Sequence, residues 1–516
     1  MSAADAGRTS GREARATAIL ACYLACALLT MAVSARLWWQ SPLELTAYEF
    51  DYFLGLFQGS GYRVAAERVM QGRALHAVLF TLLGALYAAI LLHLSRRPDA
   101  ESTARIATAC ALAAGIFAIG MPWVSPDVFF YIGTGWLDAH YGLNPYRYAM
   151  SQVPGFASDP MFANVYPRFL DGTTSYGPLF QKIAAALAAL SGGSVKLALA
   201  LHKAFYLGLH AVASGLVWRL APQHWRKAAL FGYGANPLIL FSVATCAHND
   251  HLMNVCILAA FCLLRRRQAL AAGLALGTAF SLKYFPLVFL PIMLAMALLQ
   301  RGEGRLRWQD LRRPAALGAG FMLAVLLLQR LYPASTEHVS HLLSTGVGVY
   351  RSSVFDLLDA MTRYVLPLFG APEALMVRED LGGVLRLAYI AAYALLTWRY
   401  WPRLRREPFL GGIELCLIAT LLYFVLVNTS NQEWYLTWIM GFAFVLPSEA
   451  ARTLALRLSV AYVPLVIYTV KNEQAVMTAA NLLAYLLLLA CAWLYIRRQL
   501  GEATAPVIPI EAARLS

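Results

Sequence analysis

The chain has 516 residues, of which 59% are hydrophobic and only 14% are charged. Soluble globular chains carry about 25% charged residues, so this composition excludes an ordinary soluble enzyme and indicates a protein whose solvent is lipid. Lys and Arg number 42 against 28 Asp and Glu, which gives a formal net charge of +14. In a soluble protein that excess would suggest nucleic-acid binding, so the positions of the charges decide what it means.

Apolar segments recur along the whole chain and are predicted to be membrane helices, since about 20 apolar residues are needed to cross a bilayer core of about 30 Å. The fourteen segments are 17–38, 74–94, 106–124, 197–219, 228–246, 251–264, 268–282, 285–299, 315–333, 383–400, 409–427, 434–447, 456–470 and 475–496. Some are short, which leaves half-spans or re-entrant segments as alternatives. We therefore expect an all-α polytopic membrane protein with about 14 transmembrane helices.

Lys and Arg are concentrated in alternate loops, and this bias sets the expected orientation. With the N-terminus inside, the cytoplasmic segments hold 26 cations and 10 acids, whereas the outside loops hold 12 cations and 17 acids. Both termini are therefore expected in the cytoplasm of a bacterial inner membrane protein, and no nucleic-acid partner is expected. This alternation of inside and outside loops holds only if 178–192 is an interfacial helix and not a span, and the polar residues Gln181 and Lys182 favour that interpretation. Counting it as a span would invert every later loop.

The segments predict one membrane domain in four parts. The parts are 1–105, a cytoplasmic N-terminus with two extra transmembrane helices; 106–300, a core with a long outside loop at 125–196; 301–500, further helices with an outside loop at 334–382; and 501–516, a cytoplasmic tail. Amphipathic interfacial helices are expected in the long outside loops. The first apolar segment lacks a small-residue cleavage site, so a retained anchor is expected. The eight cysteines show no metal or disulfide spacing and are expected to pack helices.

Four polar clusters lie on the expected outside face, where charged groups at a membrane boundary are costly and need a reason. The first is Ser125-Pro-Asp127-Val-Phe-Phe-Tyr131, which is followed in the same loop by Asn144-Pro-Tyr146. Pro126 is suited to the first turn of a helix, and Asp127 and Tyr131 then share a face. A carboxylate held there is suited to act as a general base on a hydroxyl. The alternative is an acid that only caps the helix.

The second cluster is His248-Asn249-Asp250-His251, at a tight turn between two short apolar segments. Two imidazoles flanking a carboxylate could bind phosphate, position a sugar or ligate a metal. The two histidines are three residues apart and no second motif of matching type accompanies them, so the spacing does not favour a metal. The alternative is a polar turn that satisfies the helix ends.

The third and fourth clusters also lie at outside turns. Lys283 and Tyr284 precede Pro286, and a lone cation there is suited to binding a phosphate; the alternative is a lysine that only reaches toward water. The fourth cluster comprises Tyr350 and Arg351 with Gln432-Glu433-Trp434-Tyr435. An aromatic ring beside an amide or carboxylate is suited to holding a sugar, although Trp and Tyr also form interfacial belts.

The order of these motifs resembles the GT-C superfamily of polytopic glycosyltransferases, and in particular bacterial mannosyltransferases that use polyprenyl-phosphate-mannose. The motifs are the acid after a core span at Asp127, Gly142-Leu-Asn144-Pro-Tyr146, Tyr176-Gly-Pro178, Asn236-Pro237 leading to His248-Asn249-Asp250, Lys283-x-x-Pro286, and Trp434-Tyr435-x-x-Trp438. The resemblance covers about residues 106–447. The helices at 17–38 and 74–94 have no clear counterpart in it.

The resemblance implies an inverting glycosyltransferase of the periplasmic face, with Asp127 as the catalytic base. The substrates would be a polyprenyl-phosphate sugar, with mannose favoured, and a glycan or glycolipid acceptor. The residues expected to bind substrate are Tyr131, Asn144, Tyr146, Tyr176, His248, Asn249, Asp250, His251, Lys283, Tyr284, Tyr350, Arg351, Gln432, Glu433, Trp434 and Tyr435. Lys283, Arg351 and one of the two histidines would face the leaving phosphate, and Asp250 would orient the acceptor.

Neither a metal nor another cofactor is expected, because members of the family with a monophosphate donor generally lack one. Two other functions stay open at this point. A lipid or sugar transporter or flippase would need charged residues near the middle of the bilayer. A polymer ligase of the same architecture would take a lipid-diphosphate donor.

Overall fold

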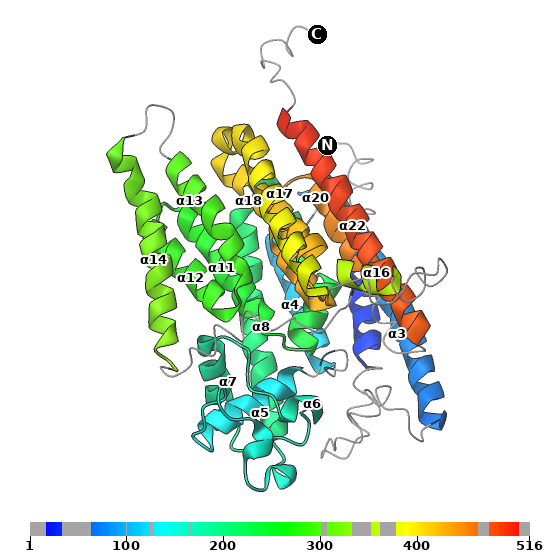
Figure 1. Cartoon of the computed structure of the whole chain (residues 1–516). Coiled ribbons are helices and arrows are strands. Elements are labelled where there is room, and N and C mark those ends of the chain that lie inside the picture. The colour runs from blue at the N-terminus through cyan, green and yellow to red at the C-terminus, as the bar shows by residue number, and fades with distance from the viewer. Residues whose placement is uncertain are drawn as a thin grey trace, which may run out of the picture.

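A computed structural model describes residues 17–32, 63–99, 101–120, 122, 125, 127–165, 167–300, 307–332, 352–361, 378–462 and 474–504. These residues fold into helices and contain no β-strand, which confirms the all-α class. Most of the helices run roughly side by side in one bundle, and α5, α6 and α7 lie at one end of it (Figure 1). We call residues 127–190, which contain these three helices, the loop layer.

The longer elements in chain order are an unlabelled helix Thr17–Ala32, α3 (Arg63–Arg96), α4 (Thr103–Ile119), α5 (Asp127–Ala139), α6 (Pro167–Leu170), α7 (Pro178–Leu190), α8 (Val195–Leu220), α9 (Arg226–Gly234), α10 (Pro237–Leu240), α11 (Asp250–Arg265), α12 (Ala269–Leu282), α13 (Leu290–Leu299), α14 (Arg312–Gln329), α16 (Val354–Ala360), α17 (Arg378–Arg406), α18 (Pro408–Leu426), α19 (Thr437–Val445), α20 (Glu449–Arg457) and α22 (Gln474–Thr504). Short helical turns that bear on the site are η5 (Phe241–Thr245), η6 (Phe285–Phe289) and η11 (Glu433–Leu436), and η12 (Leu458–Tyr462) follows α20.

Each of the fourteen expected segments contains a helix, but fewer are long enough to cross a membrane by themselves. Within the described ranges, 5 helices have the length and apolarity to do so, or up to 6 if α9 and α10–η5, which are bent by 42°, count as one span. Several others, such as α12, are apolar but shorter. The membrane character is therefore supported, while the count of fourteen spans stays a prediction.

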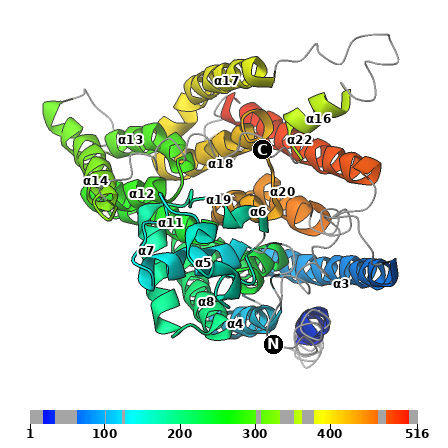
Figure 2. The same ribbon diagram turned by 60° about the horizontal axis from the view of Figure 1, so that its bottom comes forward.

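The segment treated as interfacial in the sequence is a short helix outside the main bundle. Helix α7 has 13 residues, or about 20 Å of helix, which is too short for a bilayer core of about 30 Å. Figure 2 shows α5 and α7 in front of α8, α11 and α12, at the end of the bundle that faces forward in that view. Helix α7 is thus short and set apart from the long helices, and its location at the membrane interface stays a prediction.

Two glycines allow the loop layer to pack closely. At Gly135 of α5 a Cβ atom would lie 2.5 Å from the Ala184 carbonyl oxygen of α7. At Gly177, which precedes α7, it would lie 2.0 Å from the Ser281 carbonyl oxygen. Because both approaches are to backbone, no side chain can move aside, and the layer is fixed against α12 two residues before Lys283.

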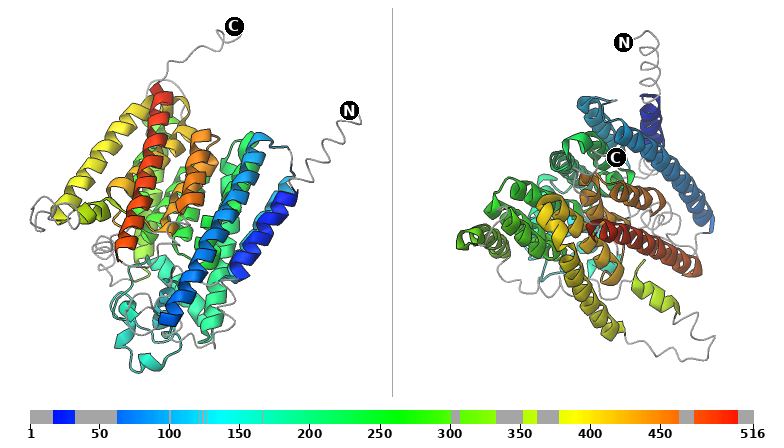
Figure 3. Two further views of the ribbon diagram at one scale, coloured as in Figure 1. Left: turned by 90° about the vertical axis from the view of Figure 1, so that its right-hand side faces the viewer. Right: turned by 90° about the horizontal axis from the view of Figure 1, so that it is seen from above.

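The two N-terminal helices pack against the rest of the bundle. Figure 3 shows the helix Thr17–Ala32 beside α3 at one edge of the molecule, and the Cys26 thiol contacts the Leu79 carbonyl at 3.7 Å. Both helices reach α9, since the Tyr23 hydroxyl donates to the Ala235 carbonyl at 2.5 Å and the Tyr87 hydroxyl to the Gly232 carbonyl at 2.5 Å. The helices set apart in the sequence are thus part of the packed core.

Helices α12 and α14 provide a direct test of the packing. At Gly320 of α14 a Cβ atom would lie 2.1 Å from the Leu270 carbonyl oxygen of α12, whereas at Gly318, half a turn away, it would meet nothing within 4 Å. Close approach of membrane helices depends on such small residues. We expect Gly320→Ala to lower the thermal unfolding midpoint of the detergent-solubilised protein and Gly318→Ala not to lower it. Equal effects of the two changes would contradict this packing.

Candidate active site

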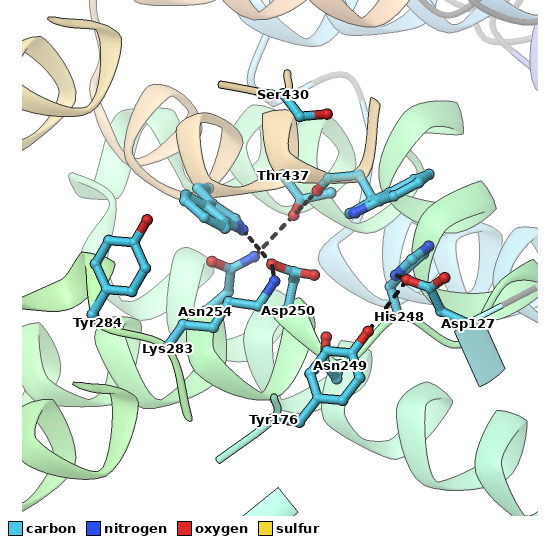
Figure 4. A network of polar contacts seen from close by, with 12 residues as sticks. Asp127, Tyr176, His248, Asn249, Asp250, Asn254, Lys283, Tyr284, Ser430 and Thr437 are labelled. Carbon is cyan, nitrogen blue, oxygen red and sulfur yellow. Dashed lines mark hydrogen bonds and ion pairs between the residues drawn. The ribbon is translucent and has the colours of Figure 1, made fainter. Parts of the chain in front are cut away.

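The polar residues at the end of the bundle beside the loop layer form one connected cluster (Figure 4). Four elements supply it: the start of α5, the turn between η5 and α11, the turn between α12 and η6, and the η11 segment. The bend between α9 and the α10–η5 segment, which precedes α11, has a local cause. Asn236 caps α10 by accepting from the Leu238 and Ile239 backbone N–H groups at 3.0 and 3.3 Å, and Pro237 occupies the first helical position.

Asp127 begins α5 and lies at the edge of the cluster. Its backbone N–H is 3.4 Å from the Ser125 hydroxyl, the Tyr176 hydroxyl donates to its carboxylate at 3.5 Å, and His248 Nδ1 is 3.9 Å from the same oxygen. The side chain is 22% exposed. The carboxylate is therefore held by neighbours and still open on one side to an incoming group.

Burial raises the pKa of the Asp127 carboxyl from 3.8 to about 6. The nearby Lys283 lowers that pKa and the Asp250 carboxylate raises it, but removal from water is the largest cause. A carboxylate with this pKa is a stronger base than an exposed aspartate and is still ionised at neutral pH, as general-base work requires.

This pKa predicts how transfer should depend on pH. Protonation of Asp127 removes the base, so kcat/KM is expected to be full above pH 7 and to fall as the pH decreases through about 6. The measurement is a rate profile in proteoliposomes, with a thermal unfolding curve at each pH to exclude loss of folded protein. A half-maximal rate at pH 4 or below would show that Asp127 is not the titrating base.

His248 is stacked on an aromatic ring and stays neutral. Its imidazole lies 4.2 Å from the Trp434 ring at an interplanar angle of 17°. Burial and the nearby Lys283 hold the pKa of His248 well below its ordinary value. The Tyr131 hydroxyl lies 3.5 Å from His248 Nδ1 and donates to the Asn249 side-chain oxygen at 3.3 Å. Among the described residues, the buried Nε2 of His248 has no hydrogen-bond partner.

Asp250 and Lys283 form a buried ion pair at the centre of the cluster. Their charged groups are 2.7 Å apart, and the Trp438 indole N–H donates to the same Asp250 oxygen at 2.9 Å. The Lys283 ammonium also lies 4.7 Å from the Tyr435 ring centre and 5.5 Å from that of Trp438. Burial is the largest single influence and would lower the pKa of Lys283, but Asp250, Tyr435 and Asp127 together outweigh it and raise that pKa. Lys283 therefore remains a cation.

The η11 segment closes the remaining side. Glu433 is 1% exposed, and the Gln432 amide donates to the Ser430 hydroxyl at 2.6 Å. Thr437 accepts from the Asn254 amide at 3.0 Å, which ties α19 to α11. The aromatic side chains of Trp434 and Tyr435 are half-buried and face His248 and Lys283 respectively.

The structure brings together most, but not all, of the residues expected from the sequence. Asn144 and Tyr146 make contacts within the loop layer. The Asn144 side-chain oxygen accepts from the Tyr146 backbone N–H at 3.0 Å, and the Tyr146 hydroxyl donates to the Tyr176 carbonyl at 2.5 Å. The Tyr284 hydroxyl is paired with that of Tyr423 at 2.9 Å. The His251 ring contacts the His210 and Tyr233 rings of α8 and α9. Tyr350 and Arg351 lie outside the described residues.

Sequence reasoning missed three members of the cluster. Trp438, which the sequence placed in a motif but not among the expected binding residues, donates to Asp250, while Asn254 and Thr437 join α11 to α19. A signal was present, because Asn254 follows Asp250 and Trp438 follows Trp434 by four residues, the spacing that shares one helix face. In the part of the chain that is described, no three His, Cys, Asp or Glu side chains gather to hold a metal ion; the expected lack of a metal stays a prediction.

Comparison with known proteins adds the family. The model of a family described as "Alpha-(1->6)-mannopyranosyltransferase, N-terminal domain" matches residues 20–299, more than half of the chain. The chain belongs to this family. The resemblance to mannosyltransferases expected from the motifs is thereby confirmed. The match contains Asp127, His248, Asp250 and Lys283, and it also includes both N-terminal helices, which had no counterpart in the motif pattern.

A curated member of this mannosyltransferase family shows the same similarity over a shorter stretch. The chain is 30% identical over 176 residues to alpha-(1->6)-mannopyranosyltransferase A of Corynebacterium glutamicum. The aligned part is 33% of this chain and 34% of the relative, about a third of either protein. The similarity therefore shows kinship, and the activity of the whole chain is argued below from the site.

Proposed function

We propose that the protein is an inverting mannosyltransferase that moves mannose from a polyprenyl-phosphate carrier to a hydroxyl of a glycan or lipid-linked acceptor, on the extracytoplasmic face of the membrane. The observation that carries this proposal is the half-buried Asp127 with its raised pKa, at the end of an apolar helix bundle and within the segment that matches the family. The excess of Lys and Arg in the alternate loops supports the assignment of this end to the outside.

Transfer would occur in one displacement. Asp127 takes the proton of the acceptor hydroxyl, the acceptor oxygen forms a bond to the anomeric carbon, and the bond from that carbon to the carrier phosphate oxygen breaks. Polyprenyl phosphate leaves with the bonding electron pair. Because one displacement inverts the anomeric carbon, an α-linked product of the kind named for the family requires a β-linked donor.

The leaving phosphate needs donors aimed at the charge that it develops. Lys283 supplies a cation, and Asp250 occupies only part of its hydrogen-bonding capacity, since an ammonium has three N–H groups. His248 is neutral, and its buried Nε2 can supply a further N–H. His248 stacks on Trp434 and the Lys283 ammonium lies over the Tyr435 ring, and these two aromatic residues are suited to hold the sugar.

The direct test uses the full-length protein in proteoliposomes with radiolabelled polyprenyl-phosphate-mannose and a synthetic mannoside acceptor. We expect label in the acceptor and an α linkage by NMR. A nucleotide-activated mannose and a lipid-diphosphate sugar serve as parallel donors. Transfer from the nucleotide sugar alone would contradict the proposal, and transfer from the diphosphate alone would favour the ligase alternative.

A further inference from the structure

One lysine is buried among the apolar helices and is not part of the cluster around Asp127. Lys203 lies on α8, one of the helices long and apolar enough to cross a membrane, and it is 7% exposed. Lys196, on the same helix, is exposed. A charged side chain in such surroundings is costly and is usually kept for a function.

Lys203 binds the last carbonyl groups of α4. Its ammonium donates to the Ala118 carbonyl at 2.9 Å and to the Gly120 carbonyl. The Thr245 hydroxyl of η5 donates to the preceding Phe117 carbonyl at 2.7 Å. The final carbonyls of a helix have no partners within it and carry the negative end of its dipole. A cation and a hydroxyl from two other elements therefore fix this end of α4.

The fixed end of α4 lies just before Asp127 in the chain. Gly120 precedes Asp127 by only seven residues, and Ser125, whose hydroxyl faces the Asp127 backbone N–H, is 1% exposed. Gly120 is closely packed, since a Cβ atom there would lie 2.6 Å from the Met31 sulfur and 3.1 Å from the Thr245 methyl group. The path from α4 to α5 thus starts from a point that Lys203 determines.

We propose that Lys203 is a positioning residue for Asp127: by binding the carbonyls that end α4, it sets where α5 begins and hence where the carboxylate meets the acceptor. This inference rests on the proposed role of Asp127. Lys203 touches neither substrate in it and acts through the backbone alone. A misplacement of about 1 Å at a reacting group can cost about 10²-fold in rate, so a small movement of α5 is enough to be measured.

The test compares Lys203→Met with Lys196→Met, a matched change at an exposed position of the same helix. We expect Lys203→Met to lower kcat by about 10²-fold, with KM for donor and acceptor little changed, and Lys196→Met to behave as the unchanged protein. Lys203→Arg, which keeps the cation, should retain more activity than Lys203→Met. Unchanged kcat in folded Lys203→Met would overturn the proposal.

A second measurement does not depend on turnover. Hydrogen–deuterium exchange read by mass spectrometry is expected to speed up in the peptide that covers 118–131 in Lys203→Met, and not in Lys196→Met. Unchanged exchange there, or faster exchange spread over the whole bundle, would show that Lys203 does not position this segment. The two measurements test the two proposals separately. An active Asp127→Asn protein would contradict the role of Asp127 as the base, whereas the exchange experiment would still show whether Lys203 fixes the backbone before α5. Lys203→Gln, which can still donate an N–H, replaces Lys203→Met if the latter does not fold.

Discussion

Replacing Asp127 by Asn is expected to lower kcat for mannose transfer by about 10³-fold, while the protein folds and binds its donor as before. Asparagine has nearly the same shape, its side-chain oxygen can still accept from Tyr176, and its backbone N–H still faces Ser125, but it cannot take the proton of the acceptor hydroxyl. Because the carboxyl is buried with a raised pKa, losing its charge does not remove a stabilising ion pair. The rate is measured in single-turnover transfer from radiolabelled polyprenyl-phosphate-mannose, with donor binding followed separately.

Asp171→Asn is the matched control for this change. Asp171 is an exposed carboxylate of the same loop layer, so it tests the loss of a negative charge from this layer without loss of the base. Its rate is expected to equal that of the unchanged protein. Retained turnover in folded Asp127→Asn would remove Asp127 from the mechanism, whatever the control shows.

Variants of the ion pair between Asp250 and Lys283 are expected to affect the stability of the fold and the rate of transfer differently. Removal of one partner of a buried ion pair costs about 3–5 kcal/mol, so Asp250→Asn and Lys283→Met should each lower the thermal unfolding midpoint. Their charged groups are 2.7 Å apart, and Asp250 is 2% exposed. In the double variant no unpaired charge remains, and most of the lost stability should return. Transfer should stay about 10²-fold lower, because the cation that faces the leaving phosphate is still missing.

An exposed ion pair is the control for this cycle. Arg105, in the first turn of α4, and Glu101, just before that helix, are 3.0 Å apart, and the arginine is 50% exposed. Surface pairs contribute about 0–1 kcal/mol, so Arg105→Met should change the midpoint little. Recovery of transfer together with stability in the Asp250→Asn, Lys283→Met double variant would show that the pair has only a structural role.

The sequence predicts the helices well because apolar segments of helical length are interrupted by charged turns. It also predicts a short helix at 178–192, where Gln181 and Lys182 interrupt an apolar stretch that is too short to span; the interfacial location of this helix stays a prediction. The number of crossings does not follow in the same way. Helix α9 and the α10–η5 segment are bent by 42°, and a bend of this kind depends on the Asn236 cap and on packing against α3 and α4, which hydrophobicity alone does not reveal.

The sequence predicts those site residues whose polar groups lie beside an expected membrane span without an evident structural role. Asp127, His248 and Lys283 stand out for that reason, and the structure places them in one cluster. Contacts between distant segments were not predictable. Lys283 and Asp250 neutralise one another across 33 residues, and Trp438 reaches Asp250 across 188. Lys203 lies within the predicted segment 197–219, and the sequence does not reveal that it binds the carbonyls at the end of α4.

The loop layer lies against the end of an apolar bundle, so under the proposed function the two substrates meet the enzyme from different phases. The acceptor arrives from water, while the donor diffuses in the plane of the bilayer. The donor concentration that the enzyme experiences is then the mole fraction of donor among the membrane lipids, and not an amount per volume. Adding empty phospholipid to vesicles at constant total donor should slow transfer by diluting the donor within the surface, whereas diluting the whole suspension should leave the rate per enzyme unchanged when acceptor is saturating.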